Sequence, residues 1–108
     1  MSHLTVSYYQ DHTIPLVHFP EKLTMVESNE VLEEIKLLTM GGTKIIVDLA
    51  GTQMMDSSGL ACLVKNRDLI SSVLSPQPTV LSLLELTRLT EVLEITLSLK
   101  DAIGNYKQ

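Results

Sequence analysis

One continuous stretch, residues 44–60, constrains the fold of this chain more than any other part of its sequence. Residues 44–49 form an apolar run rich in β-branched side chains and without a helical period, which is typical of a strand buried on both faces. The helix-start residues Asp-Ser-Ser-Gly follow at 56–59, and a helical apolar pattern comes after them. In α/β folds, ligands and partners contact the protein at the carboxyl ends of strands, where a helix N-terminus also offers free backbone N–H groups.

A hairpin and a helix are predicted before this stretch. Segments 4–9 and 14–19 predict two strands joined by a turn, with Pro15 near a strand end or at an edge because proline cannot donate to a ladder. A capping-box pattern begins at Thr24 and predicts a helix that the glycine pair at 41–42 ends. Ser28 is a competing N-cap for this helix.

A longer helix and several shorter elements are predicted after the same stretch. The helix that begins at Ser57 or Ser58 is expected to extend to Leu74, because its apolar stripe is continuous to that residue. The proline-rich segment 75–78 then ends it. The remaining predictions are a strand over 79–84, a short helix over 85–93, a strand or extended segment over 95–98, and a C-terminal helix that starts at Ser98.

This order of elements predicts an α/β fold. Strands that alternate with helices imply right-handed crossovers and parallel pairing after the hairpin. We therefore expect one domain over residues 1–108, with a mixed, mostly parallel sheet of about four to five strands and about four helices packed mainly on one face. The loop after Leu49 should open at the carboxyl edge of the sheet, and the loop 19–24 follows a neighbouring strand and could lie beside it.

Composition narrows the classes of function. The formal net charge of −5 argues against a nucleic-acid partner, which needs a basic face. No apolar run approaches the roughly 20 residues of a membrane span, and no signal peptide is visible, so we expect a cytoplasmic protein. The single cysteine, Cys62, is expected in the core. His3, His12 and His18 have no partners at metal-ligand spacing, so we expect neither a metal nor a cofactor.

Two parts of the sequence together resemble the STAS domain of bacterial anti-sigma factor antagonists. They are the strand that ends in Val-Asp-Leu at 47–49 and the helix start Met-Asp-Ser-Ser-Gly-Leu at 55–60. The Leu-Thr-Arg-Leu segment at 86–89 is similar to the Leu-Thr-Gly-Leu of the family's third helix, and residues 98–102 are similar to its closing Ser-Leu-x-x-Ala. The order of elements fits the family over nearly the whole chain.

This resemblance implies a protein-interaction switch rather than an enzyme. In the family, the first serine of the Asp-Ser-Ser-Gly motif is phosphorylated by an anti-sigma factor that is also a serine kinase, and here that serine is Ser57. The unphosphorylated protein binds the kinase and frees its sigma factor, phosphorylation breaks the complex, and a Ser/Thr phosphatase reverses the modification. The resemblance implies a partner-binding set made of Asp56, Ser57, Ser58, Gly59, Leu60, Glu21 and Thr24.

Some assignments stay open at this point. Thr24 stands where the family usually has an acidic residue, and Glu21 is a nearby carboxylate that could compensate. An alternative register matches Ser-Pro at 75–76 to the family's Ser-Pro after a strand, which would shorten the second helix. Asp56 either positions Ser57 or caps the helix, and Leu60 is either an exposed anchor for a partner or a core residue.

Two other functions remain as alternatives. One is a non-phosphorylated STAS scaffold or an accessory subunit of a larger signalling or transport complex. The other is a small-ligand or nucleotide-binding domain that uses the loop and the helix N-terminus. A serine hydrolase would need a base beside Ser57, but all the histidines lie in or near the predicted N-terminal hairpin. The chain is expected to be a monomer or a weak homodimer.

Overall fold

The predicted hairpin forms one edge of a five-stranded sheet in the computed structural model, which describes residues 4–11 and 13–106. β1 (Thr5–Tyr9) pairs antiparallel with β2 (Ile14–His18), and all later pairs in this sheet are parallel. The strand order is β1-β2-β4-β6-β7, where β4 is Ile45–Asp48, β6 is Ile70–Leu74 and β7 is Ile95–Thr96. The apolar run at 44–49 thus becomes the central strand, as its β-branched residues predict.

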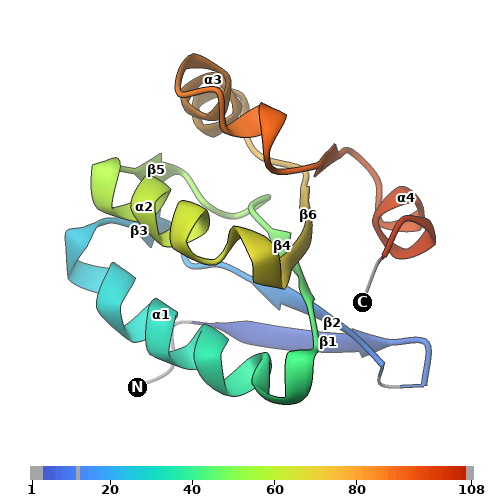
Figure 1. Cartoon of the computed structure of the whole chain (residues 1–108). Helices are drawn as coiled ribbons and strands as arrows, with labels where there is room; N and C mark the ends of the chain where they lie inside the picture. The colour runs from blue at the N-terminus through green and yellow to red at the C-terminus, as the bar shows by residue number, and fades with distance from the viewer. Residues whose placement is uncertain (1–3, 12, 107–108) are drawn as a thin grey trace.

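Each face of the sheet is covered by helices. The helices are α1 (Met25–Leu38), α2 (Ser57–Lys65), α3 (Pro78–Leu86) and α4 (Leu99–Gly104), with short 3₁₀ turns η1 (Met40–Gly42), η2 (Arg67–Leu69) and η3 (Leu89–Glu91). Side chains alternate along the strands, so the paired Val17 and Val47 belong to the core under α1 and α2, whereas the paired Leu16 and Ile46 pack with α4. α1 and α2 lie side by side over one face, and α4 lies on the other (Figure 1).

The predicted long helix from 57 to 74 is wrong. α2 ends at Lys65, where the side-chain amide of Asn66 donates to the Cys62 carbonyl at 2.7 Å, and residues 70–74 form β6. Apolar residues at 69, 70, 73 and 74 fit a helical stripe, but they also fit a strand buried on both faces, and pairing with β4 decides for the strand. Ser75 then turns the chain with φ of 50°. The alternative register, with Ser-Pro after a strand, is the one that the structure has.

The same misassignment shifted the next two predictions. The predicted strand over 79–84 is wrong, since α3 occupies Pro78–Leu86. Pro78 is the first residue of this helix, where its missing N–H costs nothing and its restricted φ suits the helix. The predicted helix over 85–93 is also wrong, because α3 ends at Leu86 and a 3₁₀ turn follows at Leu89–Glu91. Between them, Arg88 has a left-handed backbone with φ of 61°, a conformation that favours the glycine found in the similar family segment.

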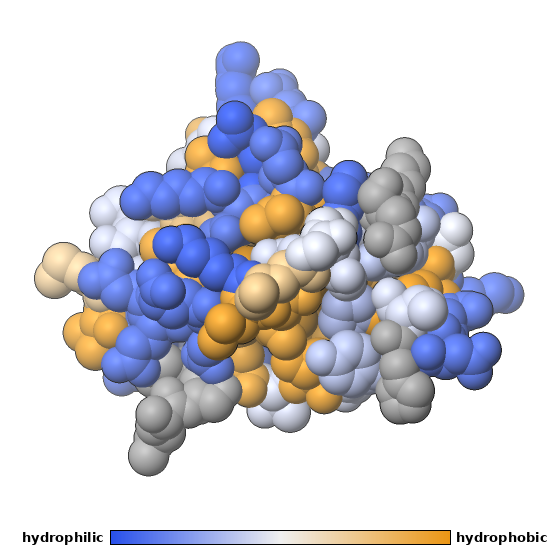
Figure 2. All heavy atoms as spheres, turned by 60° about the horizontal axis from the view of Figure 1, so that its bottom comes forward, coloured by the Kyte–Doolittle hydropathy of each residue, from blue (hydrophilic) through white to orange (hydrophobic). Residues whose placement is uncertain are grey.

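Hydrophobic side chains also lie at the surface. Figure 2 shows the side that carries α1, with hydrophobic residues scattered among hydrophilic ones. The exposed large hydrophobic side chains include Met25 and Val26 at the start of α1, Leu37 near its end and Met40 in η1, as well as Leu86 and Leu97. No helix among residues 4–11 and 13–106 combines the length and hydrophobicity that crossing a bilayer would require.

Removing one buried hydroxyl should stabilise the fold. Ser72 on β6 is fully buried on the α4 side of the sheet, and its Oγ has no hydrogen-bond partner among the described residues. Ser72→Ala is expected to raise the free energy of unfolding by about 1 kcal/mol, because a buried polar group without a partner is costly. Urea unfolding of both proteins measures the change.

Thr52 provides the matched control for this experiment. It is equally buried, but its hydroxyl donates to the Pro20 carbonyl at 2.8 Å. Thr52→Val should therefore lower the free energy of unfolding, by roughly 1 kcal/mol. If both variants shifted stability in the same direction, hydrogen bonding would not be the property that separates these two hydroxyls.

Candidate functional site

Two loops from the carboxyl edge of the sheet are joined by a second, very small sheet. β3 (Lys22–Leu23) pairs in parallel with β5 (Met54–Met55), although the sequence predicted a loop at both places. The backbone N–H groups of Gln53 and Met54 both donate to the Glu21 carbonyl, at 2.8 and 3.1 Å. The expectation that loop 19–24 lies beside the loop after Leu49 is therefore confirmed, and the contact is a backbone ladder.

Asp56 connects the starts of two helices. As the N-cap of α2, its Oδ1 accepts from the backbone N–H groups of Ser58 at 2.9 Å and Gly59 at 3.0 Å. Its Oδ2 accepts from the backbone N–H of Met25, the first residue of α1, at 3.1 Å. Capping is thus a role that the structure assigns to Asp56. One carboxylate holds the positive ends of two helix dipoles next to Ser57.

Helix capping at this point should leave a signature in the pH dependence of stability. Hydrogen bonds from Gly59, and then from Met25 and Ser58, hold the pKa of Asp56 below its ordinary value of 3.8, against a smaller opposing effect of desolvation. Because the pKa is lower in the folded state, the carboxylate stabilises the fold fully above the ordinary value, and this contribution is lost as pH falls through the folded-state pKa.

Asp56→Asn removes this titration, while its single amide oxygen can still accept from Ser58 and Gly59 and only the acceptor for the Met25 N–H is lost. The difference in free energy of unfolding between wild type and variant should stay constant above about pH 5 and shrink at lower pH. Urea unfolding at a series of pH values gives this difference. A difference that grew towards low pH would contradict the capping role.

Thr24 and Glu21 contribute to the site through hydrogen bonds that hold the loop beside Ser57. Thr24 is the N-cap of α1, and both its N–H and its hydroxyl donate to the Glu27 carboxylate, at 2.9 and 2.6 Å. The predicted capping box is therefore correct. Glu21 joins the site through its backbone carbonyl, while its side chain is exposed. These two residues shape the loop next to Ser57.

Gly59 lies where α2 passes closest to β3. A β-carbon at this position would come within 2.1 Å of the Leu23 carbonyl oxygen and 2.7 Å of the Met55 Cγ. Only glycine, which has no β-carbon, allows this close approach of the two backbones. The N-terminal turn of α2 therefore rests directly on the small sheet.

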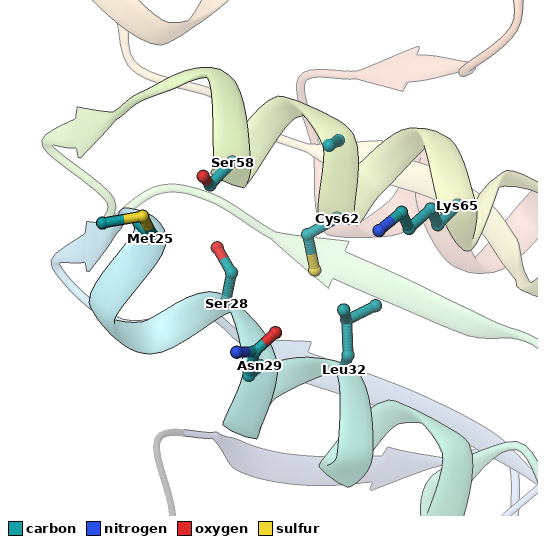
Figure 3. Close-up of a pocket in the computed structure, with 8 residues that line it drawn as sticks. Met25, Ser28, Asn29, Leu32, Ser58, Cys62 and Lys65 are labelled. Carbon is teal, nitrogen blue, oxygen red and sulfur yellow. The ribbon is translucent and has the colours of Figure 1, made fainter.

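Ser57 and Ser58 lie beside different hollows of the surface. Ser57 is exposed in the first turn of α2 and lines an apolar groove of about 460 Å³ between α2 and the segment after α3; the other lining residues are Leu60, Ala61, Val64, Lys65, Thr87 and Leu89. Ser58 is half-buried and lines a smaller, more polar pocket of about 140 Å³ between α1 and α2. Figure 3 shows Ser58 from α2 and Ser28 from α1 pointing toward one another in this pocket.

The structure also answers whether Leu60 is a core residue or an exposed contact for a partner. Leu60 is half-buried, because it packs against the main core and lines the groove at the same time. Sequence reasoning missed Val64 and Lys65 as lining residues. It had noted Thr87 and Leu89 only as part of a family-like segment, and that segment was the available signal. Met55 is buried, while Met54 is 52% exposed.

The cysteine and the histidines are the remaining candidates for reactive or metal-binding side chains. Cys62 is buried, and desolvation raises the pKa of its thiol to about 11, so it stays protonated at neutral pH. Among the described residues, no three His, Cys, Asp or Glu side chains are grouped so that they could hold a metal ion. His3 and His12 lie outside the described residues. His18 lies on the sheet, next to Asp48.

Comparisons with known proteins agree with this architecture. Residues 5–102 match the family described as STAS domain. No protein with a curated description matches the chain. Among solved structures, a Thermotoga maritima protein proposed to be an anti-sigma factor antagonist has a TM-score of 0.81 at 22% identity, with 97% of this chain and 95% of that chain covered.

Two further solved proteins have similar structures. The anti-sigma factor antagonist SpoIIAA of Bacillus in its unphosphorylated form has a TM-score of 0.74 at 18% identity, covering 94% of this chain and 93% of that chain. The phosphorylated form of SpoIIAA has a TM-score of 0.67 at 17% identity, covering 94% and 96%. The murine anion transporter Slc26a9 has a TM-score of 0.70 at 17% identity, covering 85% of this chain and 17% of that chain. At these identities the similarity shows the fold.

Proposed function

The chain belongs to the STAS domain family, and from this premise we propose that it is an anti-sigma factor antagonist controlled by phosphorylation of Ser57. In this proposal the unphosphorylated protein, one STAS domain over residues 1–108, binds a serine-kinase anti-sigma factor in the cytoplasm and releases its sigma factor. A Ser/Thr phosphatase removes the phosphate and so regenerates the form that binds the anti-sigma factor. The observation that carries the proposal is that an exposed serine in the first turn of α2 lies at an apolar groove.

The groove supports a protein partner. Its lining is almost entirely apolar and comes from α2 and from the segment after α3. Grooves of this kind bind apolar side chains of a partner, because covering them removes hydrophobic surface from water. Leu60, Val64 and Leu89 are the residues that we propose as its contact surface, together with Ser57 at the rim.

A phosphate on Ser57 would change this surface strongly. It adds a charge of about −1.5 to −2 at neutral pH, directly beside the Asp56 carboxylate. The partner would then have to desolvate two adjacent anionic groups in order to reach the apolar groove, which disfavours the complex. In the free protein the same phosphate stays in water near the N-terminus of α2, where the helix dipole favours negative charge.

Thr24 bears on how strongly the switch acts. The family resemblance implies a carboxylate at this position, whereas here the Thr24 hydroxyl and N–H donate to the Glu27 carboxylate. Glu21 has an exposed side chain and we propose it as the carboxylate at the edge of the partner contact. With no carboxylate at position 24, repulsion of a phosphate on Ser57 comes mainly from Asp56.

Mass spectrometry with site mapping tests the proposal. The protein is purified from its source cells under several growth conditions, including stress, beside a Ser57→Ala variant. We expect a gain of one phosphate, mapped to Ser57 and absent from the variant. The absence of phosphate under every condition, or phosphate at another site only, would contradict the proposal.

One alternative function has support from a specific observation. The same fold forms 17% of the Slc26a9 transporter chain, so a STAS domain can be one part of a larger protein. A non-phosphorylated scaffold or accessory subunit of a signalling or transport complex would bind its partner regardless of the state of Ser57. Partner binding that is equal for wild type and Ser57→Asp would favour this alternative. The prediction of a monomer or weak homodimer stays open under both functions.

A further inference from the structure

Three polar side chains form a continuous chain of hydrogen bonds on the sheet, on the α4 side and apart from Ser57. The Oγ of Ser7 on β1 lies 3.1 Å from Nε2 of His18 on β2. Nδ1 of His18 lies 2.6 Å from Oδ2 of Asp48 on β4. Asp48 is held in turn, because its Oδ1 accepts from the backbone N–H of Ala50 at 2.9 Å. Three neighbouring strands therefore supply a serine, a histidine and an aspartate in the order that nucleophilic serines use.

The direction of each hydrogen bond follows from the chemistry of the groups. A carboxylate can only accept, so Nδ1 of neutral His18 carries the proton and donates to Asp48. Nε2 is then without a proton and accepts from the Ser7 hydroxyl. In this tautomer the imidazole is oriented to remove the proton of Ser7 when its oxygen attacks an electrophile.

The three side chains differ in their exposure to solvent. The Asp48 side chain is only 15% exposed, and that of His18 is 37% exposed. Ser7 is half-buried on β1, the edge strand of the sheet. α4 lies on the same face but packs against β6 and β7, toward the opposite edge of the sheet from β1. The orienting carboxylate is thus shielded from water, while the hydroxyl and the base are open to a small reagent.

We propose that Ser7 is a nucleophilic serine that accepts an acyl group from an activated ester, with His18 as the base and Asp48 as the positioning residue. In this step the Ser7 Oγ forms a bond to the acyl carbon, the bond from that carbon to the leaving oxygen breaks, and the Ser7 proton passes to Nε2 of His18. Acylation of Ser7 and release of the acyl group by water both pass through a tetrahedral oxyanion, and an activated ester, with its good leaving group, lets the first step proceed without dedicated donors to that charge. The proposal therefore concerns covalent modification of Ser7, and it is independent of the proposed function of Ser57.

Acetylation by p-nitrophenyl acetate tests the proposal directly. The folded protein is treated with this ester, p-nitrophenolate release is followed, and the acetylated residues are mapped by mass spectrometry. We expect the mass of one acetyl group on Ser7 at early times, ahead of every other serine. His18→Gln should slow the reaction at Ser7 about 100-fold, the range expected for loss of a general base. Ser82→Ala, which removes an exposed serine of α3, should leave acetylation of Ser7 unchanged.

Further comparisons separate chemistry from folding. Acetylation of exposed lysines in the same samples shows whether the ester was equally reactive in each of them. Circular dichroism shows whether each variant is folded. Asp48→Asn keeps an acceptor for Ala50 but cannot accept from Nδ1, so the Ser7 rate should fall at least about tenfold. The ¹⁵N shifts of the His18 ring should move to the other tautomer in this variant. Urea-unfolded wild type should show no preference for Ser7.

Two results would overturn the proposal. One is a folded wild-type protein in which Ser7 is acetylated no faster than other serines. The other is a folded His18→Gln variant in which Ser7 is acetylated at the wild-type rate. Neither result would bear on phosphorylation of Ser57, which is measured at a different residue.

Discussion

Replacing Gly59 with alanine is expected to lower the free energy of unfolding by about 3 kcal/mol or more. This is a large part of the total stability of a typical domain, so we expect a marginally folded variant. The added β-carbon would lie 2.1 Å from the Leu23 carbonyl oxygen. This oxygen belongs to β3, which is tied to β5 in the small sheet, so it cannot move without breaking the contact between the two loops. Urea and thermal unfolding followed by circular dichroism measure the loss.

Gly104 is the matched control for this substitution. It is the last residue of α4, it has nothing within 4 Å of its β-carbon position, and alanine suits a helix better than glycine. Gly104→Ala is therefore expected to leave stability unchanged or to raise it by up to about 1 kcal/mol. If Gly59→Ala were as stable as Gly104→Ala, the N-terminal turn of α2 would not rest on the Leu23 carbonyl as described.

Local signals in the sequence were sufficient for the elements that depend on neighbouring residues. The capping box at Thr24 and the cap at Ser98 each act within one helical turn, so the residue types alone predict them. At Asp56 the residue type left two roles open, and the structure shows the cap. The central strand was equally clear, because three consecutive β-branched residues, Ile45-Ile46-Val47, are typical of a buried strand. These elements carry the motif residues of the candidate site.

Elements that depend on distant partners were not predictable in the same way. The apolar residues of 69–74 fit a helix as well as a buried strand, and only pairing with β4 separates the two. β3 and β5 have two residues each, too few for any periodic pattern. The Ser7, His18 and Asp48 chain depends on the register of three strands. The groove beside Ser57 needs the position of η3, which the misassigned strand and helix concealed.

The structure also places the two adjacent serines of the motif in different surroundings. Ser57 and Ser58 are adjacent in the motif, but Ser57 lines the apolar groove next to η3 and Ser58 lines the polar pocket next to α1 (Figure 3). They thus face different sides of α2, roughly 100° apart around the helix axis. A negative charge at either position has the same magnitude and almost the same place in the chain. The two positions therefore offer a test of which side of α2 contacts the partner.

Ser57→Asp is expected to weaken binding to the proposed serine-kinase partner at least about 100-fold, because a fixed charge at the rim of the groove must be desolvated beside Asp56 when the partner binds. Ser58→Asp adds the same charge on the α1 side and is expected to change the affinity no more than about threefold, since water screens a charge that stays outside the contact. Ser57→Ala, which removes only the hydroxyl, should bind like wild type. Isothermal titration calorimetry with the purified kinase gives the three affinities.

Each combination of outcomes leads to a different interpretation of α2. Loss of binding in Ser57→Asp alone places the partner on the groove formed by Leu60, Val64 and Leu89. An equal loss of affinity in both aspartate variants would indicate that the partner contacts the N-terminus of α2 and not the groove. Loss in Ser58→Asp alone would place the partner on the α1 side and would contradict the proposed surface. Circular dichroism on all variants is needed first, because Ser58 is half-buried and its replacement must leave α2 folded for the comparison to hold.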